Sequence, residues 1–405
     1  MNSTRVSTGL RFAAALSTKA ETAAAIDEIC SGVAERLGSQ ATLALVFASH
    51  HHADGFGRLA AAICDCLGSE HLLGCTGESI VGSDREVEER PALALWAAHL
   101  PGVSVRTMHL EFERTAEGPS FVGWPDELND AWPKDSSLLL LGEPFSFPAD
   151  VLLARLNEDQ PGVQVFGGMA SGASAPGQNR LLLGRRELTQ GAVAALIHGP
   201  VRLTSVVSQG CRPIGRPLVI TKAERNVIQE LSGKPALVQL REIFQSLSPD
   251  DQSLVQHGLH VGRVVSEYRD QFGRGDFLIR NVVGADPESG SVAIGDWVRV
   301  GQTVQFHVRD ARTADEDLTE MLSSARRGVS ASPDSAAPAG ALLFTCNGRG
   351  SRLFSEPHHD AHALATAWGN LPTAGFFAQG EIGPVGGKNF LHGFTASVVV
   401  FQPAG

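Results

Sequence analysis

The segment Leu342-Leu-Phe-Thr-Cys346 is a short apolar run, which is typical of a buried β-strand. Residues 357–368 follow as a predicted helix that begins at a proline, and residues 373–377 (TAGFF) form a second strand-like run. A strand, a helix and a second strand in this order indicate an α/β protein.

The same unit occurs twice more along the chain. In the first half its strands and helix are predicted at 42–48, 57–67 and 72–75, and then at 138–141, 148–156 and 163–166. A glycine-rich loop and another apolar strand follow each copy; the loops are 74–78, 167–172 and 378–383, and the strands are 92–98, 192–198 and 396–401. We interpret this pattern as a threefold internal repeat. The alternative is the ordinary alternation of strands, helices and turns in an α/β chain.

The remaining segments complete the prediction. A helix is expected over 20–38, antiparallel strands with a tight turn over 201–220, and a helix over 234–247 that Pro249 and two aspartates end. Strand signals alternate with turns over 257–308, a helix covers 311–327, and residues 328–340 form an exposed linker. The fold class is therefore α/β (mixed α+β), with mixed parallel and antiparallel sheets flanked by helices. We expect two modules, 1–233 and 234–405.

Charge and composition exclude several classes of function. The 405 residues carry a formal net charge of −11, and basic residues do not cluster, which argues against nucleic-acid binding and against an anionic membrane surface. No stretch reaches 18 apolar residues, so no membrane span is expected. Six cysteines are few for this length, and we interpret them as reduced thiols of a cytoplasmic protein.

The turn after the strand 342–346 is the main candidate site. Cys346 leads into Asn347, Gly348, Arg349 and Gly350. Glycines let backbone N–H groups approach an anion, and Arg349 offers a planar fork for a carboxylate. The alternative is a buried cysteine on a core strand beside a solvent-facing arginine.

A second glycine cluster contains Gly380 and Glu381, and His392 is predicted to belong to the same ligand-binding set. A carboxylate among turn glycines can hold an ammonium group, or it can cap a turn. Gly74, Gly167 and Gly168, in the equivalent loops of the first half, complete the predicted ligand-binding set.

Histidine motifs and thiols suggest weaker alternatives. His50-His-His52 and the pair His358 and His362 contain metal-ligating groups, but their spacing does not match an established metal motif. A cysteine hydrolase using Cys346 would need a histidine within hydrogen-bonding reach, which spacing alone does not place. We expect no metal, no cofactor and no catalytic residue.

Several of these segments resemble the FIST family. The C-terminal carriers are 343–350 (LFTCNGRG), 373–377, 380–384 (GEIGP) and 391–392; the N-terminal carriers are 45–48, 74–77, 165–168 and 210–215. The resemblance implies a FIST N module followed by a FIST C module. It also implies a sensory role in binding small ligands such as amino acids.

The function expected from this resemblance is a small-ligand-binding sensory or signal-transduction module without catalysis of its own. Arg349 and glycine N–H groups would hold the carboxylate of an amino acid, and Glu381 its ammonium group. No kinase, cyclase, receiver or F-box segment is visible, so a protein partner would carry the output. The alternatives are a protein-interaction scaffold, as in F-box relatives, and a Cys346-dependent enzyme.

Overall fold

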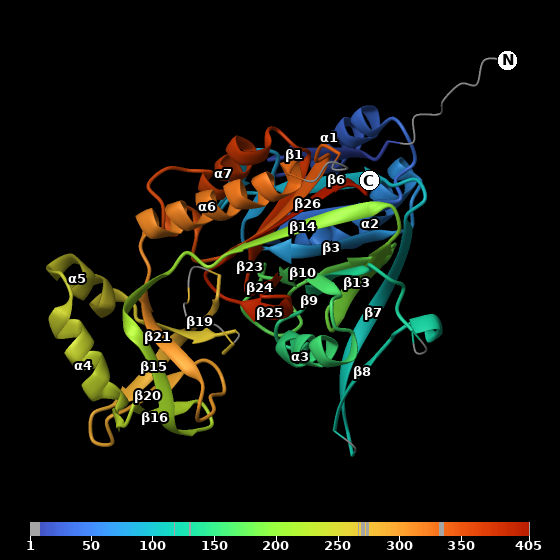
Figure 1. Cartoon of the computed structure of the whole chain (residues 1–405). Coiled ribbons are helices and arrows are strands. Elements are labelled where there is room, and N and C mark those ends of the chain that lie inside the picture. Colours follow the sequence, from blue (N-terminus) through green and yellow to red (C-terminus); the bar gives the residue numbers. More distant parts are fainter. Residues whose placement is uncertain are drawn as a thin grey trace. The chain divides into compact units, whose positions relative to one another are not determined.

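The computed structural model describes residues 9–116, 118–128, 131–265, 267–268, 272, 275–331 and 336–404 (Figure 1). The chain forms two compact units: unit 1 comprises 1–207 and 321–405, and unit 2 comprises 208–320. Unit 2 is therefore an insertion within the sequence of unit 1. The modules expected at 1–233 and 234–405 divide the sequence at a different point and stay a prediction.

Unit 1 contains three copies of one motif, which confirms the threefold repeat. In each copy two parallel strands flank a helix, a β-hairpin follows, and a last strand returns antiparallel beside the first parallel strand. Repeat 1 comprises β1 (Arg11–Ser17), α1 (Thr22–Leu37), β2 (Leu43–Ser49), α2 (Phe56–Leu67), β3 (Leu72–Gly77), β4 (Ile80–Gly82), β5 (Arg85–Val87) and β6 (Leu93–His99). Repeat 2 comprises β7 (Ser104–Thr115), β8 (Gly118–Val122), β9 (Ser137–Gly142), α3 (Ala149–Asp159), β10 (Gln164–Met169), β11 (Leu181–Leu183), β12 (Arg186–Leu188) and β13 (Ala192–His198). Repeat 3 comprises β14 (Val201–Ser208), β22 (Gly340–Cys346), α7 (His359–Trp368), β23 (Thr373–Ala378), β24 (Glu381–Val385), β25 (Lys388–His392) and β26 (Ala396–Pro403).

Three glycines fix the equivalence of the repeats. Gly74, Gly167 and Gly375 each lie in the second parallel strand, opposite a residue of the first. A Cβ at these positions would lie 2.5, 1.9 and 1.7 Å from the carbonyl oxygens of Val46, Leu140 and Leu343. Each glycine therefore permits close approach of two strands. The equivalent of Gly74 in repeat 3 is thus Gly375. This residue precedes the loop 378–383, which the sequence pattern pairs with the loop 74–78.

Each repeat gives its hairpin to another repeat's sheet. The strand orders are β1-β6-β2-β3-β11-β12, β25-β24-β10-β9-β13-β7-β8 and β14-β26-β22-β23-β4-β5. The hairpin of repeat 1 thus extends the sheet of repeat 3, that of repeat 2 the sheet of repeat 1, and that of repeat 3 the sheet of repeat 2. The amides of Thr76, Met169 and Phe377 bond equivalent carbonyls, those of Arg180, Gly380 and Ser79, at 3.0, 2.8 and 2.9 Å. The exchange is therefore cyclic, and no sheet is complete without another repeat.

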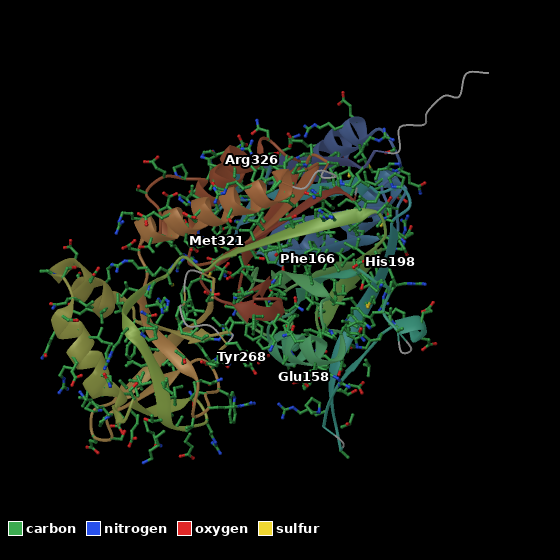
Figure 2. The ribbon with its side chains drawn as sticks, viewed as in Figure 1. Glu158, Phe166, His198, Tyr268, Met321 and Arg326 are labelled. Carbon is green, nitrogen blue, oxygen red and sulfur yellow. The ribbon has the colours of Figure 1, made fainter. Side chains whose placement is uncertain are left out.

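The inner faces of the three sheets share one aromatic core. Phe47 stacks on Phe376 with ring centroids 5.2 Å apart, and Phe166 meets Phe401 edge-on at 6.3 Å. Phe166 is labelled within this region in Figure 2. These contacts join repeats 1 and 3, and repeats 2 and 3. Burial of large aromatic surface is therefore a main stabilising term of unit 1.

Unit 2 is built around a closed antiparallel barrel. Its sheet order is β15-β21-β18-β19-β20-β16-β17, and an additional β15–β16 pairing closes the ring. The strands are β15 (Arg212–Glu224), β16 (Val227–Leu231), β17 (Lys234–Pro235), β18 (His260–Val264), β19 (Phe277–Asp286), β20 (Ser291–Ile294) and β21 (Thr303–Val308). Closure leaves the six barrel strands without an unpaired edge. The helix α6 (Ala311–Ser330) carries the chain from unit 2 into repeat 3.

The helices of unit 2 correct one expectation. The helix α4 (Ala236–Ser246) lies where predicted, but Pro249 begins another helix, α5 (Pro249–His257). The Ser248 side chain caps it by accepting from the Asp251 amide, proline occupies its first turn, and Asp250 and Asp251 favour its positive end. These residues were interpreted as a break, but together they are a helix-start signal.

Other segments show smaller differences. The strands β14 and β15 over 201–220 do not pair with each other, since β14 lies beside β26 and β15 lies in the barrel. Residues 328–330 of the predicted linker belong to α6, and 332–335 lie outside the described residues. Among the described residues, no helix combines the length and the apolar character that a bilayer crossing requires.

Candidate functional site

Three equivalent junctions form where an exchanged hairpin contacts the helix of the repeat that receives it. The hairpin turns correspond, because Ser83, Gly184 and Gly386 all have left-handed backbones, with φ of 57°, 55° and 58°. The amides of Ser83 and Gly184 also bond equivalent carbonyls, those of Thr373 and Leu72. The side chains around these turns differ between the three junctions.

At two of the junctions, residues of the hairpin next to the turn bond the helix. Arg185, next to Gly184, bonds Asp65 of α2 at 2.7 Å and Glu70 at 3.0 Å, and these hydrogen bonds raise its pKa. In the hairpin of repeat 3, the buried Asn389 donates its backbone amide to Asn157 Oδ1 of α3 at 2.8 Å and accepts from the Asn157 side chain at 2.9 Å. These bonds hold each hairpin to its helix.

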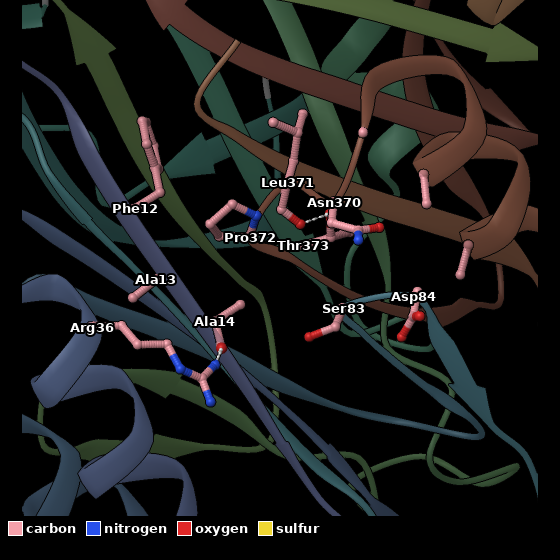
Figure 3. A pocket seen from close by; sticks show the side chains of 13 residues that line it. Phe12, Ala13, Ala14, Arg36, Ser83, Asp84, Asn370, Leu371, Pro372 and Thr373 are labelled. Carbon is pink, nitrogen blue, oxygen red and sulfur yellow. Dashed lines mark hydrogen bonds between the residues drawn. The ribbon is translucent and has the colours of Figure 1, made fainter.

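The third junction, between the β4–β5 turn and α7, contains a cavity of about 340 Å³ (Figure 3). Asp84 occupies the position that corresponds to Arg185, and α7 presents the small side chains of Ala361 and Ala365. The cavity is also lined by residues 12–14 of β1, Arg36 of α1 and the loop 369–373. Its size falls within the usual range of small-ligand sites.

Opposite charges lie on different walls of this cavity. Figure 3 shows Arg36 on one side and Asp84 on the other, with Leu371 and Pro372 between them. Arg36 Nη1 donates to the Ala14 carbonyl at 2.5 Å, which orients the guanidinium. Within the described part of the chain, neither Arg36 nor Asp84 has an ion-pair partner. The arrangement can hold a small dipolar molecule with an apolar middle.

A buried charge cluster adjoins the cavity through the same two elements. Arg349 is fully buried and forms a bidentate pair with Asp360 of α7, Nε–Oδ2 at 2.6 Å and Nη2–Oδ1 at 2.7 Å. Burial alone would raise the pKa of Asp360, but the charge and hydrogen bonds of Arg349 lower it. Glu86, two residues after Asp84, accepts from the Ala361 amide at 2.9 Å. Burial, and then the charge of Asp360, raise the pKa of Glu86 to about 8.

The backbone at the start of α7 is held in an unusual conformation. His358 has a φ of 65°, in the left-handed region, and its Nδ1 accepts from the Glu86 amide at 3.1 Å. The ring of His359 stacks on Phe354 with centroids 3.4 Å apart and bonds Asp360. Such strain needs support from its surroundings, which the hairpin and Arg349 supply.

Among the predicted site residues, Cys346 to Gly350 lie together after β22. Cys346 is half-buried, and its Sγ accepts from the Gly348 amide at 3.5 Å. A Cβ on Gly350 would lie 2.7 Å from Glu88 Oε1, so this glycine permits the turn to approach β5. The fork of Arg349 is already occupied by Asp360, and its role in ligand binding stays a prediction.

The structure connects the second predicted group to the first through one residue, Thr395. Glu381 is fully buried, and its Oε2 accepts from the Thr395 amide at 3.0 Å and from its hydroxyl at 2.7 Å. The Thr395 carbonyl accepts from the Cys346 amide at 3.0 Å. Glu381 therefore caps the start of β26, which is the structural alternative that the sequence had left open.

The other predicted residues lie in the sheets. Gly168 and His392 both pair with Glu381 in the sheet of repeat 2, and the His392 ring bonds the Gly383 carbonyl. Gly380 is a neighbour of Gly168, whereas Gly74 and Gly167 serve close strand packing as described above. Gly74 lies in a different sheet from Glu381.

Sequence reasoning missed Arg36, Asp84 and Glu86. The first two are exposed charges outside any glycine-rich segment, and Glu86 lies in a short strand that no periodicity indicated. An alignment of the three hairpin turns could have indicated this site, because it shows that Asp84 occupies the position of Arg185.

Two domain families match this chain. A FIST N domain matches residues 42–234, and a FIST C domain matches residues 236–384. The chain is 44% identical over 393 residues to "Uncharacterized protein Rv0628c" of Mycobacterium tuberculosis, covering 97% of this chain and 100% of the relative. It is 43% identical over 367 residues to "Uncharacterized protein Mb0898c" of Mycobacterium bovis, covering 91% and 92% of the two chains. The chain belongs to the FIST family, whose domains are associated with sensory and signal-transduction roles.

Proposed function

We propose that this chain is a sensory module that binds a small dipolar molecule in the cavity between the β4–β5 turn and α7. A carboxylate of the ligand pairs with Arg36, an ammonium group with Asp84, and Leu371 and Pro372 contact the apolar part. Amino acids and their homologues with more widely spaced charges belong to this class. The protein acts in the cytoplasm, a proposal that rests on the cysteine usage of the sequence.

One observation carries this proposal. Hydrogen bonds join the hairpin to the helix at all three junctions, through Arg185, Asn389 and Glu86, and the third junction also has a cavity with charges of both signs on its walls. At the junction that receives the hairpin of repeat 2, Arg185 occupies the position of Asp84 and reaches the helix, so the open arrangement around Asp84 is not a requirement of the fold. Its retention at one position supports a binding role.

The buried cluster supports the transmission of a binding signal. Asp84 shares a hairpin with Glu86, and Ala361 follows Asp360 on α7. A ligand that draws Asp84 towards α7 changes the fit of Glu86 beside Asp360 and Arg349, where the energetic cost of misplacing a charge is high. Binding at the surface is thereby coupled to a buried network.

Isothermal titration and thermal-shift measurements with the twenty amino acids, γ-aminobutyrate and δ-aminovalerate test the proposal. We expect at least one to bind, and a ligand held at 100 times its Kd to raise the free energy of unfolding by about 2.7 kcal/mol. Arg36→Gln and Asp84→Asn should each weaken that binding at least about tenfold, because each leaves a ligand charge unpaired.

Matched controls remove the same charges elsewhere. Arg58→Gln on α2 and Glu35→Gln on α1 change exposed residues outside the cavity and should leave the affinity unchanged. Absence of binding across the set, or equal affinity in Asp84→Asn and the wild type, would refute the proposal.

A second candidate function, a protein-interaction scaffold, is favoured by the surface of unit 2. Six of the eight exposed large hydrophobic side chains of the described chain lie there: Val219, Val238, Tyr268, Val283, Trp297 and Val300. Exposed apolar side chains in such numbers are typical of interaction surfaces. A partner that carries the output of the sensor would bind there, and Trp297→Ser should then weaken its capture without changing ligand affinity in unit 1.

A further inference from the structure

Repeat 2 has a second cavity, of about 330 Å³, between β8, residues 124, 128 and 132, and α3. Its apolar lining is aromatic and aliphatic, with Phe121, Trp124 and Trp132 facing Leu152 and Leu156. The two indole rings have centroids 5.4 Å apart and planes inclined at 53°, so they form adjoining walls. Both tryptophans are half-buried.

The loop backbone holds these rings in place. Gly123 has a φ of 95°, and a Cβ there would lie 1.9 Å from the His109 carbonyl oxygen. Glycine therefore lets the chain cross β7 closely and turn Trp124 towards α3. The cavity is thus part of the ordered fold around repeat 2.

The polar part of the cavity favours positive charge. Asp159 lies in the last turn of α3 and Gln160 at its C-cap, where the carbonyl ends of the helix carry a partial negative charge. Asp126 and Glu127 lie between the two tryptophans in sequence, outside the lining, and Glu127 pairs with Arg106 at 3.1 Å. Arg155 is the cation on the lining, and it pairs with Asp159 at 3.2 Å while more than half exposed. An exposed pair of this kind is weak and readily exchanged.

We propose that this cavity binds a small free molecule with a quaternary or methylated ammonium group. The cation lies against the faces of Trp124 and Trp132, whose π electrons attract it, and Asp159 and the α3 C-terminus supply the opposing charge. Arg155 competes with the ligand for Asp159 in the empty protein. This site is separate from the cavity of the proposed sensor, and neither proposal depends on the other.

Titration of the full chain with choline, followed by tryptophan fluorescence and calorimetry, tests the inference. The neutral isostere 3,3-dimethylbutan-1-ol has the same shape without the charge. We expect choline to bind at least about fivefold more tightly than the isostere, the order of a cation–π contribution. Equal binding of both, or binding of neither, overturns the proposal.

Charge variants on α3 give effects of opposite sign. Asp159→Asn should weaken choline binding about three- to tenfold, whereas Arg155→Gln should strengthen it by removing a competitor. Glu158→Gln, an exposed neighbour outside the lining, is the matched control and should change affinity less than twofold. Equal responses of Asp159→Asn and Glu158→Gln contradict the assignment.

Two further measurements complete the test. Trp132→Leu should abolish the fluorescence response, and because Arg155→Gln and Asp159→Asn alter exposed side chains, the inference stays testable if the tryptophan variant does not fold. Co-sedimentation with phosphatidylcholine vesicles distinguishes a lipid headgroup from a free ligand. We expect none, and Trp132-dependent co-sedimentation would overturn the assignment to a free molecule.

Discussion

Glu86 is a carboxylate that folding places against Asp360 and away from water. Its pKa is raised to about 8, so the native state binds a proton that the unfolded chain releases near pH 4.5. Because the native state binds more protons over this window, stability falls as pH rises from about 4.5 to about 8. Glu86→Gln keeps an acceptor for the Ala361 amide and removes the titration. We expect this variant to be more stable than the wild type at pH 8.5 by roughly 1–3 kcal/mol.

Urea unfolding at pH 5.5 and 8.5 measures this difference. The advantage of Glu86→Gln should shrink at pH 5.5, where Glu86 of the native wild type is already protonated. Glu89→Gln changes an exposed acid of the same segment and should leave the pH dependence as it is. Identical pH profiles for Glu86→Gln and the wild type would show that Glu86 does not titrate in this range.

Gly375 and Gly328 form a matched pair for the effect of adding a methyl group. A Cβ on Gly375 would lie 1.7 Å from the Leu343 carbonyl oxygen, whereas a Cβ on Gly328, in the exposed part of α6, meets nothing within 4 Å. We expect Gly375→Ala to lose more than about 4 kcal/mol of stability or to fail to fold. Gly328→Ala should gain about 0.5–1 kcal/mol from helix propensity. Thermal and urea unfolding decide both, and a mild effect of Gly375→Ala would contradict the close strand approach.

At the scale of elements, the exchanged hairpin β24–β25 depends on one buried amide. Besides its bonds to Asn157, Asn389 donates to the Val163 carbonyl and accepts from the Val165 amide, both at 2.8 Å. Asn389→Ala leaves buried backbone groups unpaired, and we expect a loss of about 2–4 kcal/mol. Lys388→Ala, at the exposed neighbouring position, should cost less than about 0.5 kcal/mol. Comparable losses from the two variants would disprove the anchoring role of Asn389.

Local sequence signals predicted the parallel strands and their helices because continuous apolar runs mark strands buried on both faces. They failed at Pro249, where a helix ends and another begins within three residues, so that stop and start signals overlap. They also could not place Arg36 and Asp84 on the walls of one cavity. These residues are 48 positions apart in the sequence. The exchange of hairpins brings them to the same cavity, and this exchange leaves no local sequence pattern.

The glycine-rich turns show the same limit at the predicted site. Convergence of residues 346–350 and 380–381 around one ligand stays a prediction, and Thr395 bonds both Cys346 and Glu381. Residue types alone do not show which carboxylate pairs with a buried arginine, so the pairing of Asp360 with Arg349 could not be predicted. The candidate site that the structure supports is therefore the cavity next to the buried turn.

For the whole of unit 1, cyclic exchange predicts a single cooperative unfolding step. Loss of any hairpin exposes an edge strand in another repeat's sheet, so the three repeats cannot open independently. Hydrogen exchange should give β3, β10 and β23 one common free energy of opening. Asn389→Ala should lower that value in all three strands, and a loss confined to β25 and α3 would contradict the prediction.

The exchange of hairpins also bears on how such a chain can arise. A polypeptide one third as long could close the same ring only by trading hairpins among three molecules, and its stability would then depend on concentration. Fusion of the three copies makes closure intramolecular. It also lets the residues of each junction diverge, so that Arg185 bonds the helix at one, Asn389 at another and Glu86 at the third, beside the cavity.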